Sequence, residues 1–421
     1  MRIGISTSVI QAGKSGIAEY VLSLVRAFRA HPGTHQFVLF VLEDDMPLFE
    51  FASDSTRLVP VSARNRSPMR DIVWHQTALP RLARQHGLDV LHVPSYRRLP
   101  WRRPCALVGT VHDLAAFHIP GKYDWKRMWY GRVGAAVLAR RQDEIITVSQ
   151  STARDINAFW NVPADRVTVI HHGVDRERFS RVTRPTARRE CHARFGLRQP
   201  FFLYVARLEH PAKNHVRLIR AFDWFKTNTG SPWQLVLAGS DWHGAETIHS
   251  AVRQSAARSD IRCLGFVSEP DLPLLYRAAE VCVYPSLYEG FGFPPLQAMA
   301  SECPVLCSSR GALGEVVGDA ALTVDPEDWR ELAAQMTRLA DDPGLRLELA
   351  TRGLQRARLF DWQKTAADTL KVYARAAARA RTRDGHSELA AKAHSREPIW
   401  ETHVVATRPP SRARWRQPET P

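Results

Sequence analysis

Short apolar runs alternate with segments of helical periodicity along most of the chain, and this alternation is the feature that most limits its fold. Examples are "HQFVLFVL", "LDVLHVPS", "CALVGTVHD" and "DEIITVSQ", each followed by loop and helix signals. Such alternation predicts parallel strands that are buried on both faces by the helices between them. We therefore expect an α/β protein built on doubly wound parallel sheets.

The alternation occurs in two series, which predicts two domains. A polar, arginine-rich stretch over 176–199 separates the first series from a second that starts with "PFFLYVARL". After the second series we expect closing helices and a C-terminal helix, and then a tail with few apolar residues that is disordered. The expected units are an N-terminal Rossmann-like domain at 1–185, a C-terminal Rossmann-like domain at 186–378 and a basic tail at 379–421. The two domains should face each other across a cleft.

The charge of the chain is uneven. The formal net charge is +15, and residues 1–200 hold 30 lysines and arginines against 17 aspartates and glutamates. A basic first half indicates an anionic partner, or else the solvated surface of an arginine-preferring protein. The sequence leaves both explanations open.

Composition narrows the cellular setting. The chain is 44% hydrophobic and 24% charged, and no apolar run approaches 18 residues, so we expect a protein without a membrane span. Its opening "MRIGIST" has a strand pattern rather than the features of a signal peptide. The six cysteines are scattered, which indicates a reducing compartment. Cys303 and Cys307 share a strand start without nearby histidines, so we expect no zinc site. We expect a cytoplasmic location.

The loop after the first strand contains Gly13-Lys14-Ser15, which suggests a nucleotide-hydrolysing P-loop. That motif also requires a glycine at the position that Ser8 occupies, so we reject it. A turn with Gly13 and Gly16 between a first strand and a first helix still predicts close approach of the backbone to a ligand.

The stretch "VYPSLYEGFGFPPLQAMA", which starts at Val283, carries the most informative chemistry. Gly290 and Gly292 let backbone amides approach a ligand, and the helix start that follows favours phosphate. Glu289 can accept hydrogen bonds from hydroxyls. An acid beside an anion-binding helix start suits a sugar joined to a diphosphate.

This stretch resembles the donor-sugar site of the family 4 retaining glycosyltransferases, which have the GT-B fold. The family pattern has two glutamates separated by seven residues, and here the second position is Gln297. The resemblance implies that Glu289 contacts the donor sugar. It also implies donor contacts from Gly290, Phe291, Gly292, Phe293 and Gln297. Gln297 keeps hydrogen-bonding capacity toward a ribose diol but lacks the charge.

Two basic residues match the family's diphosphate-binding positions. They are Arg207 and Lys213 in "YVARLEHPAKNHVRLIRAF". A departing nucleoside diphosphate gains negative charge, and fixed cations in a dry site stabilise it. The resemblance therefore implies a catalytic role for both residues.

In the first half, "GTVHDLAAFHIP" matches the family's His-Asp-Leu element at the end of a strand. The resemblance places His112 against the donor sugar's hydroxyls as a catalytic residue. Asp113 would either orient His112 or cap the next turn. The family's glycine-rich opening loop matches Gly13 and Gly16 in position.

A transferase of the other common fold would need an acidic pair holding a divalent cation, and the candidate is Glu43-Asp44-Asp45. We interpret that stretch as a solvated loop and expect no metal and no cofactor. The expected donor is GDP-mannose or a UDP-sugar, and the expected acceptor is a hydroxyl of a saccharide or lipid-linked glycan. The alternatives are a phosphorylase-like enzyme, for which no pyridoxal-phosphate lysine is identifiable, and a catalytically degenerate sugar-nucleotide-binding or assembly protein.

Basic and aromatic residues are interleaved over 120–141, as in helices that lie on membranes. Arg97, Arg98 and Arg103 could extend that surface. It predicts peripheral contact with an anionic membrane at its inner face, or else aromatic side chains that pack in the core. No nucleic-acid-binding module is recognisable, so we expect no nucleic acid partner.

Overall fold

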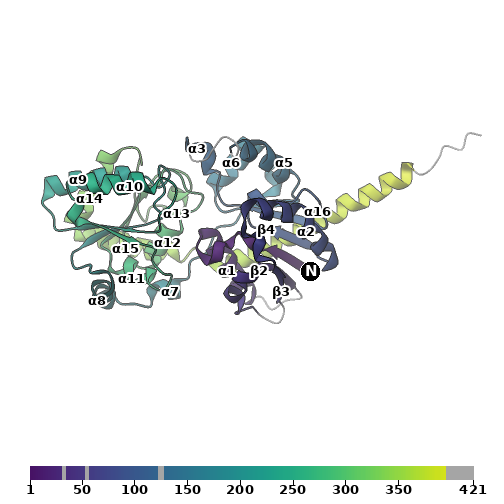
Figure 1. Ribbon diagram of the computed structural model, residues 1–421, viewed down its shortest axis with the longest axis horizontal. Helices are drawn as coiled ribbons and strands as arrows, with labels where there is room; N and C mark the ends of the chain where they lie inside the picture. The colour runs from purple at the N-terminus through teal and green to yellow at the C-terminus, as the bar shows by residue number, and fades with distance from the viewer. Residues whose placement is uncertain (31–34, 53–55, 122–127, 395–421) are drawn as a thin grey trace, which may run out of the picture. The chain divides into compact units, whose positions relative to one another are not determined.

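The computed structural model describes residues 1–30, 35–52, 56–121 and 128–394 (Figure 1). Among these residues are two parallel sheets, one of seven strands and one of six. The prediction of doubly wound parallel sheets is therefore confirmed.

The first sheet has the strand order β3-β2-β1-β4-β5-β6-β7, and every pairing is parallel. Its strands are β1 (Arg2–Ser6), β2 (Gln36–Leu42), β3 (Thr56–Val61), β4 (Val90–Val93), β5 (Ala106–Val111), β6 (Glu144–Thr147) and β7 (Val167–Val169). The helices between them are α1 (Gly16–Phe28), α2 (Pro68–Gln85), α3 (Ala115–His118), α5 (Ala135–Arg140) and α6 (Gln150–Trp160). Short 3-10 or π turns are η1 (Ser8–Gly13), η2 (Glu43–Phe49), η3 (Ala63–Arg66), η4 (Tyr96–Arg98), η5 (Tyr130–Gly134) and η6 (Ala164–Arg166).

The second sheet has the order β10-β9-β8-β11-β12-β13, again all parallel. Its strands are β8 (Phe201–Val205), β9 (Gln234–Ala238), β10 (Ile261–Gly265), β11 (Val281–Tyr284), β12 (Val305–Ser308) and β13 (Leu322–Val324). Its helices are α9 (His215–Thr229), α10 (Ala245–Gln254), η7 (Arg258–Asp260), α11 (Leu272–Ala278), α12 (Phe293–Ala300), α13 (Leu313–Val317), α14 (Trp329–Asp341) and α15 (Pro343–Ala357).

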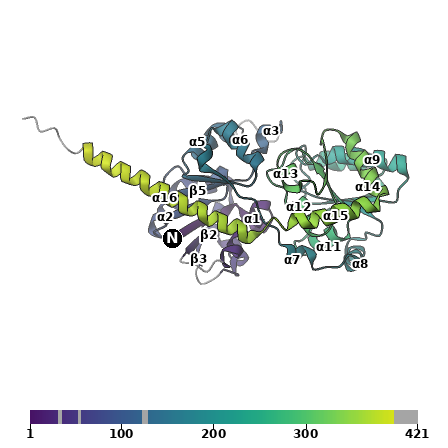
Figure 2. The ribbon, with the colours of Figure 1, turned by 180° about the vertical axis from the view of Figure 1, so that it is seen from behind.

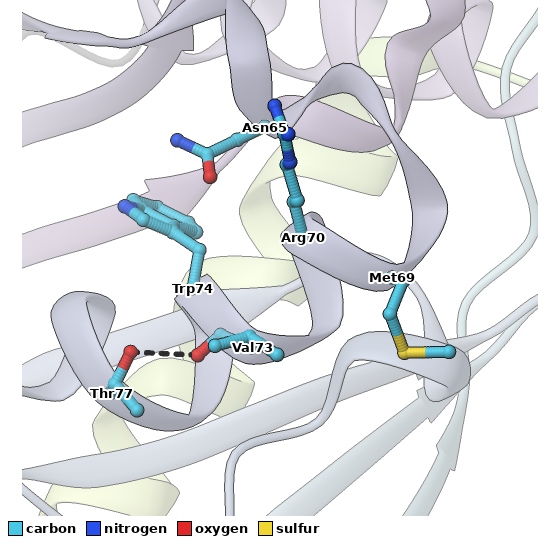
Figure 3. Close-up of a pocket in the computed structure, with 6 residues that line it drawn as sticks. All are labelled: Asn65, Met69, Arg70, Val73, Trp74 and Thr77. Carbon is cyan, nitrogen blue, oxygen red and sulfur yellow. Dashed lines mark hydrogen bonds between the residues drawn. The ribbon is translucent and has the colours of Figure 1, made fainter.

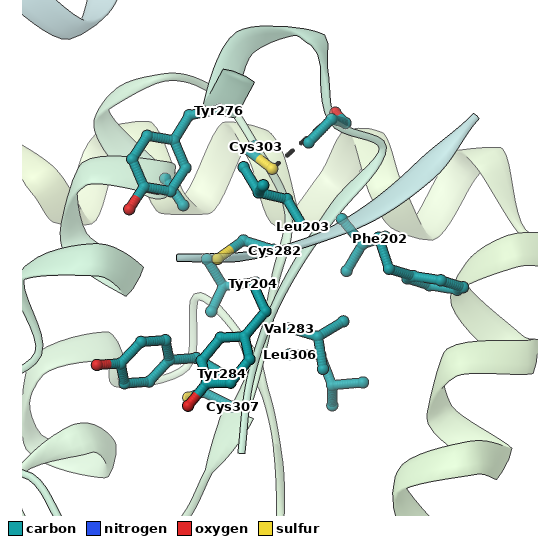
Figure 4. Packing of buried hydrophobic residues seen from close by; sticks show 14 of the residues in the cluster. Phe202, Leu203, Tyr204, Tyr276, Cys282, Val283, Tyr284, Cys303, Leu306 and Cys307 are labelled. Atoms are coloured by element: carbon teal, nitrogen blue, oxygen red, sulfur yellow. Dashed lines mark hydrogen bonds between the residues drawn. The ribbon is translucent and has the colours of Figure 1, made fainter. Parts of the chain in front are cut away.

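The cores explain why the apolar runs form central strands. All four residues of β11 and all six of β5 are buried, as expected for strands covered by helices on both faces. Figure 4 shows the packing around β8, β11 and β12, where Cys282, Cys303 and Cys307 lie among Tyr, Leu and Phe side chains. These three thiols are free and buried, and they act as small apolar groups.

The polar stretch that we expected to separate the domains contains two helices, α7 (Arg176–Ser180) and α8 (Arg184–Phe195). Ala187 and Cys191 are the buried residues of α8, and both join the core of the second sheet. Two small buried residues give almost no apolar period, which is why the sequence did not predict this helix. The domain division at residue 186 stays a prediction.

The last helix, α16 (Trp362–His394), returns to the core of the first sheet. Trp362, Val372 and Tyr373 are buried there beside residues of β1, β2 and α1. In Figure 2 the yellow ribbon of α16 passes beside α1 and β2. Regular structure thus extends beyond residue 379, where we expected the disordered tail to begin, because the sequence remains rich in alanine and other helix formers. Residues 395–421 lie outside the described part of the chain.

Candidate active site

The loops after β8 and β11 carry the residues that we expected to bind a diphosphate and a sugar. Arg207 and Lys213 follow β8, and Glu289 follows β11. The chain moves outward in opposite directions from these two adjacent strands, to β9 and β10 on one side and to β12 and β13 on the other. Open α/β sheets bind ligands beyond the carboxyl ends of their strands at such a switch point.

Lys213 and Glu289 form an ion pair at this switch point. Lys213 Nζ lies 2.5 Å from Glu289 Oε1, and each side chain is 16% exposed. The same oxygen accepts hydrogen bonds from the hydroxyls of Tyr284 (3.1 Å) and Ser286 (2.6 Å). Burial is the largest single effect and acts to lower the pKa of Lys213, but the charge and hydrogen bond of Glu289, together with Tyr204 and Glu209, outweigh it and raise that pKa above its ordinary value. The ammonium group therefore stays charged at neutral pH.

Arg207 is the more exposed of the two expected cations. Its guanidinium carbon lies 4.5 Å from the ring centre of Trp242, and Nη2 lies 3.3 Å from Glu209 Oε2. The stacked ring and the carboxylate limit the conformations of a side chain that remains 42% exposed. The guanidinium is thus held in place while it is still accessible to a ligand.

Asn214, which the sequence did not indicate, joins the two loops. Its amide nitrogen donates to the carbonyl oxygens of Pro285 (2.9 Å) and Pro326 (2.6 Å), and its side chain is buried. Its backbone is left-handed, with φ of 61°, a conformation that asparagine adopts more readily than most residues. This residue therefore holds the start of α9 against the end of β11.

Gly290 brings the second-sheet loop against the first sheet. A Cβ atom at this position would lie 1.8 Å from the carbonyl oxygen of His112 and 2.7 Å from Asp113 Cβ. No side chain fits there, so glycine is required for the observed approach. The structure therefore brings the loop of Glu289 next to the expected His-Asp element.

His112 is a neutral hydrogen-bonding group in this environment. Burial lowers its pKa to about 4, although Asp113 acts in the opposite direction. Its Nε2 lies 3.2 Å from the carbonyl oxygen of Pro94, which requires a proton on Nε2, and its ring meets the ring of Tyr20 edge-on at 4.9 Å. Asp113 Oδ1 accepts from Ala115 N at 3.0 Å, which is the capping contact that we had considered.

The opening loop has a different internal structure from a P-loop. Ser15 caps α1 by accepting from Ala18 N (3.2 Å), and Lys14 lies 5.7 Å from the ring centre of Phe266. Gly16 lies against Phe293, the first residue of α12, since a Cβ on Gly16 would be 3.6 Å from its ring. Gly13 has φ of +82°, and a Cβ there would be 3.5 Å from the side chain of Leu48.

Gln297 makes a contact that the sequence did not suggest. Its Nε2 lies 3.1 and 3.2 Å from the two carboxylate oxygens of Glu19 on α1, and its Oε1 accepts from the hydroxyl of Tyr276 at 3.3 Å. Gln297 is buried. The position at which the family pattern has glutamate is thus occupied by an amide that faces a carboxylate of the first half.

Two second-sheet residues hold the start of α6. Glu315 accepts from the backbone nitrogens of Gln150 (2.9 Å) and Ser151 (3.3 Å) and lies 2.7 Å from His171 Nε2. The hydroxyl of Tyr288, next to Glu289, donates to Asp155 of the same helix. Glu315 and Tyr288 therefore fix the loops of the second sheet against α6.

The basic and aromatic segment that we considered for membrane contact is only partly described. Lys122 to Arg127 lie outside the described residues, while Trp129 and Val133 are exposed. Among its expected extensions, Arg103 donates to the carbonyl oxygen of Arg141. No helix in the described ranges is long and apolar enough to cross a bilayer.

Two further observations concern other sites in the described residues. Asp45, which we expected in a solvated loop, is buried, and its Oδ1 lies 3.0 Å from Arg66 Nη2. No group of three or more potential metal ligands occurs in the part of the chain that the structure describes.

A surface pocket of about 290 Å³ lies on η3 and α2, apart from the expected donor residues (Figure 3). It is lined by Asn65, Met69, Arg70, Val73, Trp74 and Thr77.

Comparison with known proteins gives two family matches that together span most of the chain. Residues 14–178 match Glycosyltransferase Family 4, and residues 189–356 match Glycosyl transferases group 1. O-antigen chain mannosyltransferase B of Escherichia coli is 30% identical over 392 residues, which cover 89% of this chain and 99% of that protein. O-antigen chain mannosyltransferase RfbU of Salmonella typhimurium is 27% identical, with 78% and 90% covered.

Solved structures share the fold at lower identity. Sucrose-phosphate synthase from Thermosynechococcus elongatus superposes with a TM-score of 0.71 at 21% identity, covering 89% of this chain and 98% of that one. HepE of Anabaena, in complex with UDP and glucose, gives 0.70 at 18% identity, with 89% and 99% covered. With the sequence matches on both halves, the chain belongs to the family 4, group 1 glycosyltransferases and has their GT-B fold.

Proposed function

We propose that this glycosyltransferase moves a hexose, with mannose as the first candidate, from a nucleoside-diphosphate sugar to a hydroxyl of a saccharide or lipid-linked glycan. The choice of mannose is supported by the two O-antigen mannosyltransferases described above and by the MMP alpha-(1->4)-mannosyltransferase of Mycolicibacterium hassiacum. The last is 33% identical over 60% of this chain and 59% of its own length. GDP-mannose is therefore the first donor to test, and UDP-sugars are the second.

The observation that carries the proposal is the partly buried ion pair of Lys213 and Glu289, with Gly290 packed against the backbone of His112. A cation suited to a diphosphate and an acceptor suited to sugar hydroxyls thus lie side by side beyond β8 and β11, and the backbone of His112 lies against the next residue of the same loop. An ion pair that served only to stabilise the fold would not require the close contact of Gly290 with the His112 backbone, where no side chain fits.

In the proposed mechanism the diphosphate leaves as its negative charge is stabilised by Arg207 and Lys213. Backbone amides at 290–293 add to this stabilisation, because they lie at the start of α12. Glu289 and His112 hold the sugar hydroxyls. Because the proton of the neutral imidazole is on Nε2, its Nδ1 can accept from a hydroxyl without adding charge. We assign no side chain as a covalent nucleophile. We propose that the configuration of the sugar is retained through a front-face route without a metal, in which the leaving phosphate accepts the acceptor's proton.

We also keep the proposal that the first half contacts an anionic membrane next to a lipid-linked acceptor. Its support is the excess of basic residues before residue 200 and the exposed side chains of Trp101 and Trp129. Sedimentation with vesicles of anionic and of zwitterionic lipid tests it. Binding to anionic vesicles that is lost at high salt is expected, and equal recovery with both vesicle types contradicts it.

The donor is tested with a thermal-shift panel of GDP-mannose, UDP-glucose and other nucleotide sugars. Ligand at about 100 times its Kd adds about 2.7 kcal/mol to the free energy of unfolding, so the true donor raises the melting temperature by several degrees. Release of the nucleoside diphosphate in the presence of glycan acceptors then tests transfer. A protein that binds a nucleotide sugar and never transfers it is the degenerate binder considered above, and one that binds none contradicts the proposed function.

A further inference from the structure

We propose that Glu19, in the first turn of α1, binds a vicinal diol of the nucleotide sugar and that Gln297 orients its carboxylate. The inference rests on the proposed function, because it concerns the donor of the same site. A nucleotide sugar offers two vicinal diols, one on the ribose and one on the hexose ring. A carboxylate has two oxygens whose spacing suits two adjacent hydroxyl donors.

Glu19 has far fewer hydrogen-bond donors than its carboxylate can accept. An ionised carboxylate has about four acceptor positions. Among the residues that the structure describes, the donor to Glu19 is the single amide nitrogen of Gln297, and no cation lies within ion-pair distance of it. Glu19 is only partly buried, so its unused acceptor positions remain within reach of a ligand.

The electrostatic environment of Glu19 also points to a ligand. Burial raises the pKa of its carboxyl to about 7, Glu269 and Asp175 act in the same direction, and Arg178 opposes them. The guanidinium of Arg178 is engaged by Glu269, with Nη1 3.5 Å from Glu269 Oε2, and it does not pair with Glu19. Carboxyl groups whose pKa is raised in this way are common at functional sites, where hydroxyls of a bound ligand can donate hydrogen bonds that stabilise the ionised form.

Gln297 can only face Glu19 with its amide nitrogen. An ionised carboxylate only accepts hydrogen bonds, so the amide nitrogen is the end that faces Glu19, and the hydroxyl of buried Tyr276 then donates to Oε1. A glutamate at 297 would place a second carboxylate about 3 Å from Glu19, where one of the two would have to take up a proton. Glutamine at 297 and glutamate at 19 are therefore a matched pair.

The pair lies one helical turn from the loop that we propose binds the donor. Gly16 contacts Phe293, and Glu19 and Gln297 follow these residues by one turn in α1 and α12. One turn of α-helix rises about 5.4 Å, which is the size of one sugar ring. A ring joined to a diphosphate at Lys213 can thus present its diol to Glu19.

Calorimetric Kd values test the inference with GDP, 2′-deoxy-GDP and GDP-mannose, and with the matching uridine set if the thermal-shift panel selects it. Glu19→Gln keeps the shape of the side chain and removes its charge. In the wild type, losing a hydroxyl that donates to a carboxylate should weaken binding about tenfold or more. In Glu19→Gln the ratio of the Kd values with and without that hydroxyl should fall to near one, while the affinity for 2′-deoxy-GDP is retained.

If Glu19→Gln loses the difference in Kd between GDP and 2′-deoxy-GDP, the diol that Glu19 binds is that of the ribose. If the wild type binds GDP-mannose more tightly than GDP and Glu19→Gln does not, the diol that Glu19 binds is that of the hexose. The double variant Glu19→Gln with Gln297→Glu, which again pairs one carboxylate with one amide, should bind more tightly than Gln297→Glu alone. Glu246→Gln, an exposed substitution on α10, is the matched control and should keep wild-type ratios.

The inference is overturned if Glu19→Gln, folded by circular dichroism, weakens all three ligands equally or leaves every ratio unchanged. Equal weakening is what a purely structural hydrogen bond between α1 and α12 predicts. A wild-type protein that binds no nucleotide overturns the proposed function and this inference together, whereas wild-type binding with unchanged ratios in the variant overturns this inference alone.

Discussion

Substituting Gly290 with alanine should separate the loop of Glu289 from His112 and slow sugar transfer strongly. The added Cβ would lie 1.8 Å from the carbonyl oxygen of His112, and real Cβ contacts are essentially never shorter than 3.0 Å. The two backbone segments must therefore move apart by at least 1.2 Å, the difference between these distances. A misplacement of about 1 Å costs about 100-fold in rate, so kcat should fall by about two orders of magnitude.

The assay is release of nucleoside diphosphate from the donor identified in the thermal-shift panel, with saturating acceptor. Gly131→Ala is the matched control, because the nearest atom to a Cβ there is 4.0 Å away. The contact joins two elements that each fold around their own sheet, so circular dichroism should show both variants folded. Wild-type kcat in Gly290→Ala would refute the reasoning, because the close approach would then have no part in the reaction.

Three further predictions concern charge and hydrogen bonding. Lys213→Met should lower kcat about 100-fold, measured by donor turnover, because it removes the partly buried cation beside Glu289; turnover within a factor of two of wild type contradicts this. Glu315→Gln should cost about 2 kcal/mol of unfolding free energy at pH 7. Burial opposes the ionised form, but the bonds from His171 and α6 hold the pKa of Glu315 below its ordinary 4.5, so its contribution is present above pH 4.5 and fades as the pH falls. Urea unfolding at pH 7 and pH 4 checks this, and an equal loss at both pH values rules it out. Asn214→Ala should cost about 3 kcal/mol, because two buried carbonyl oxygens lose their donor and alanine is strained at positive φ; a chemical-denaturation midpoint equal to that of wild type argues against it.

Local patterns in the sequence were sufficient for the sheets and for part of the site. The apolar runs predicted the central strands because burial on both faces leaves few polar positions in a parallel strand. The glycines around Glu289 predicted close approach of backbone amides to a ligand, and the close contact that the structure shows at Gly290 is with the backbone of His112. The catalytic and binding roles of these residues stay predictions.

The contacts that join the two halves could not be predicted, because they link residues far apart in the chain. Glu19 and Gln297 are separated by 278 positions, and neither residue carries a local signal for the other. Glu315 caps α6 from a different sheet, and a glutamate in the first turn of its own short helix gives no indication of that. The packing of α16 on the first sheet could not be predicted either, because the helical spacing of its apolar residues does not indicate which of the two sheets they pack against.

The central claim is that Glu289 acts on the donor sugar, and Glu289→Gln tests it most directly. The measurement is kcat for sugar transfer beside the Kd of the same nucleotide sugar, with Glu246→Gln as control. We expect a kcat at least about 100-fold lower with the nucleotide sugar still bound, because the amide keeps the size of the side chain but loses the charge that holds Lys213 and the sugar hydroxyls. A variant with wild-type kcat and Kd would mean that the carboxylate of Glu289 has no part in sugar transfer.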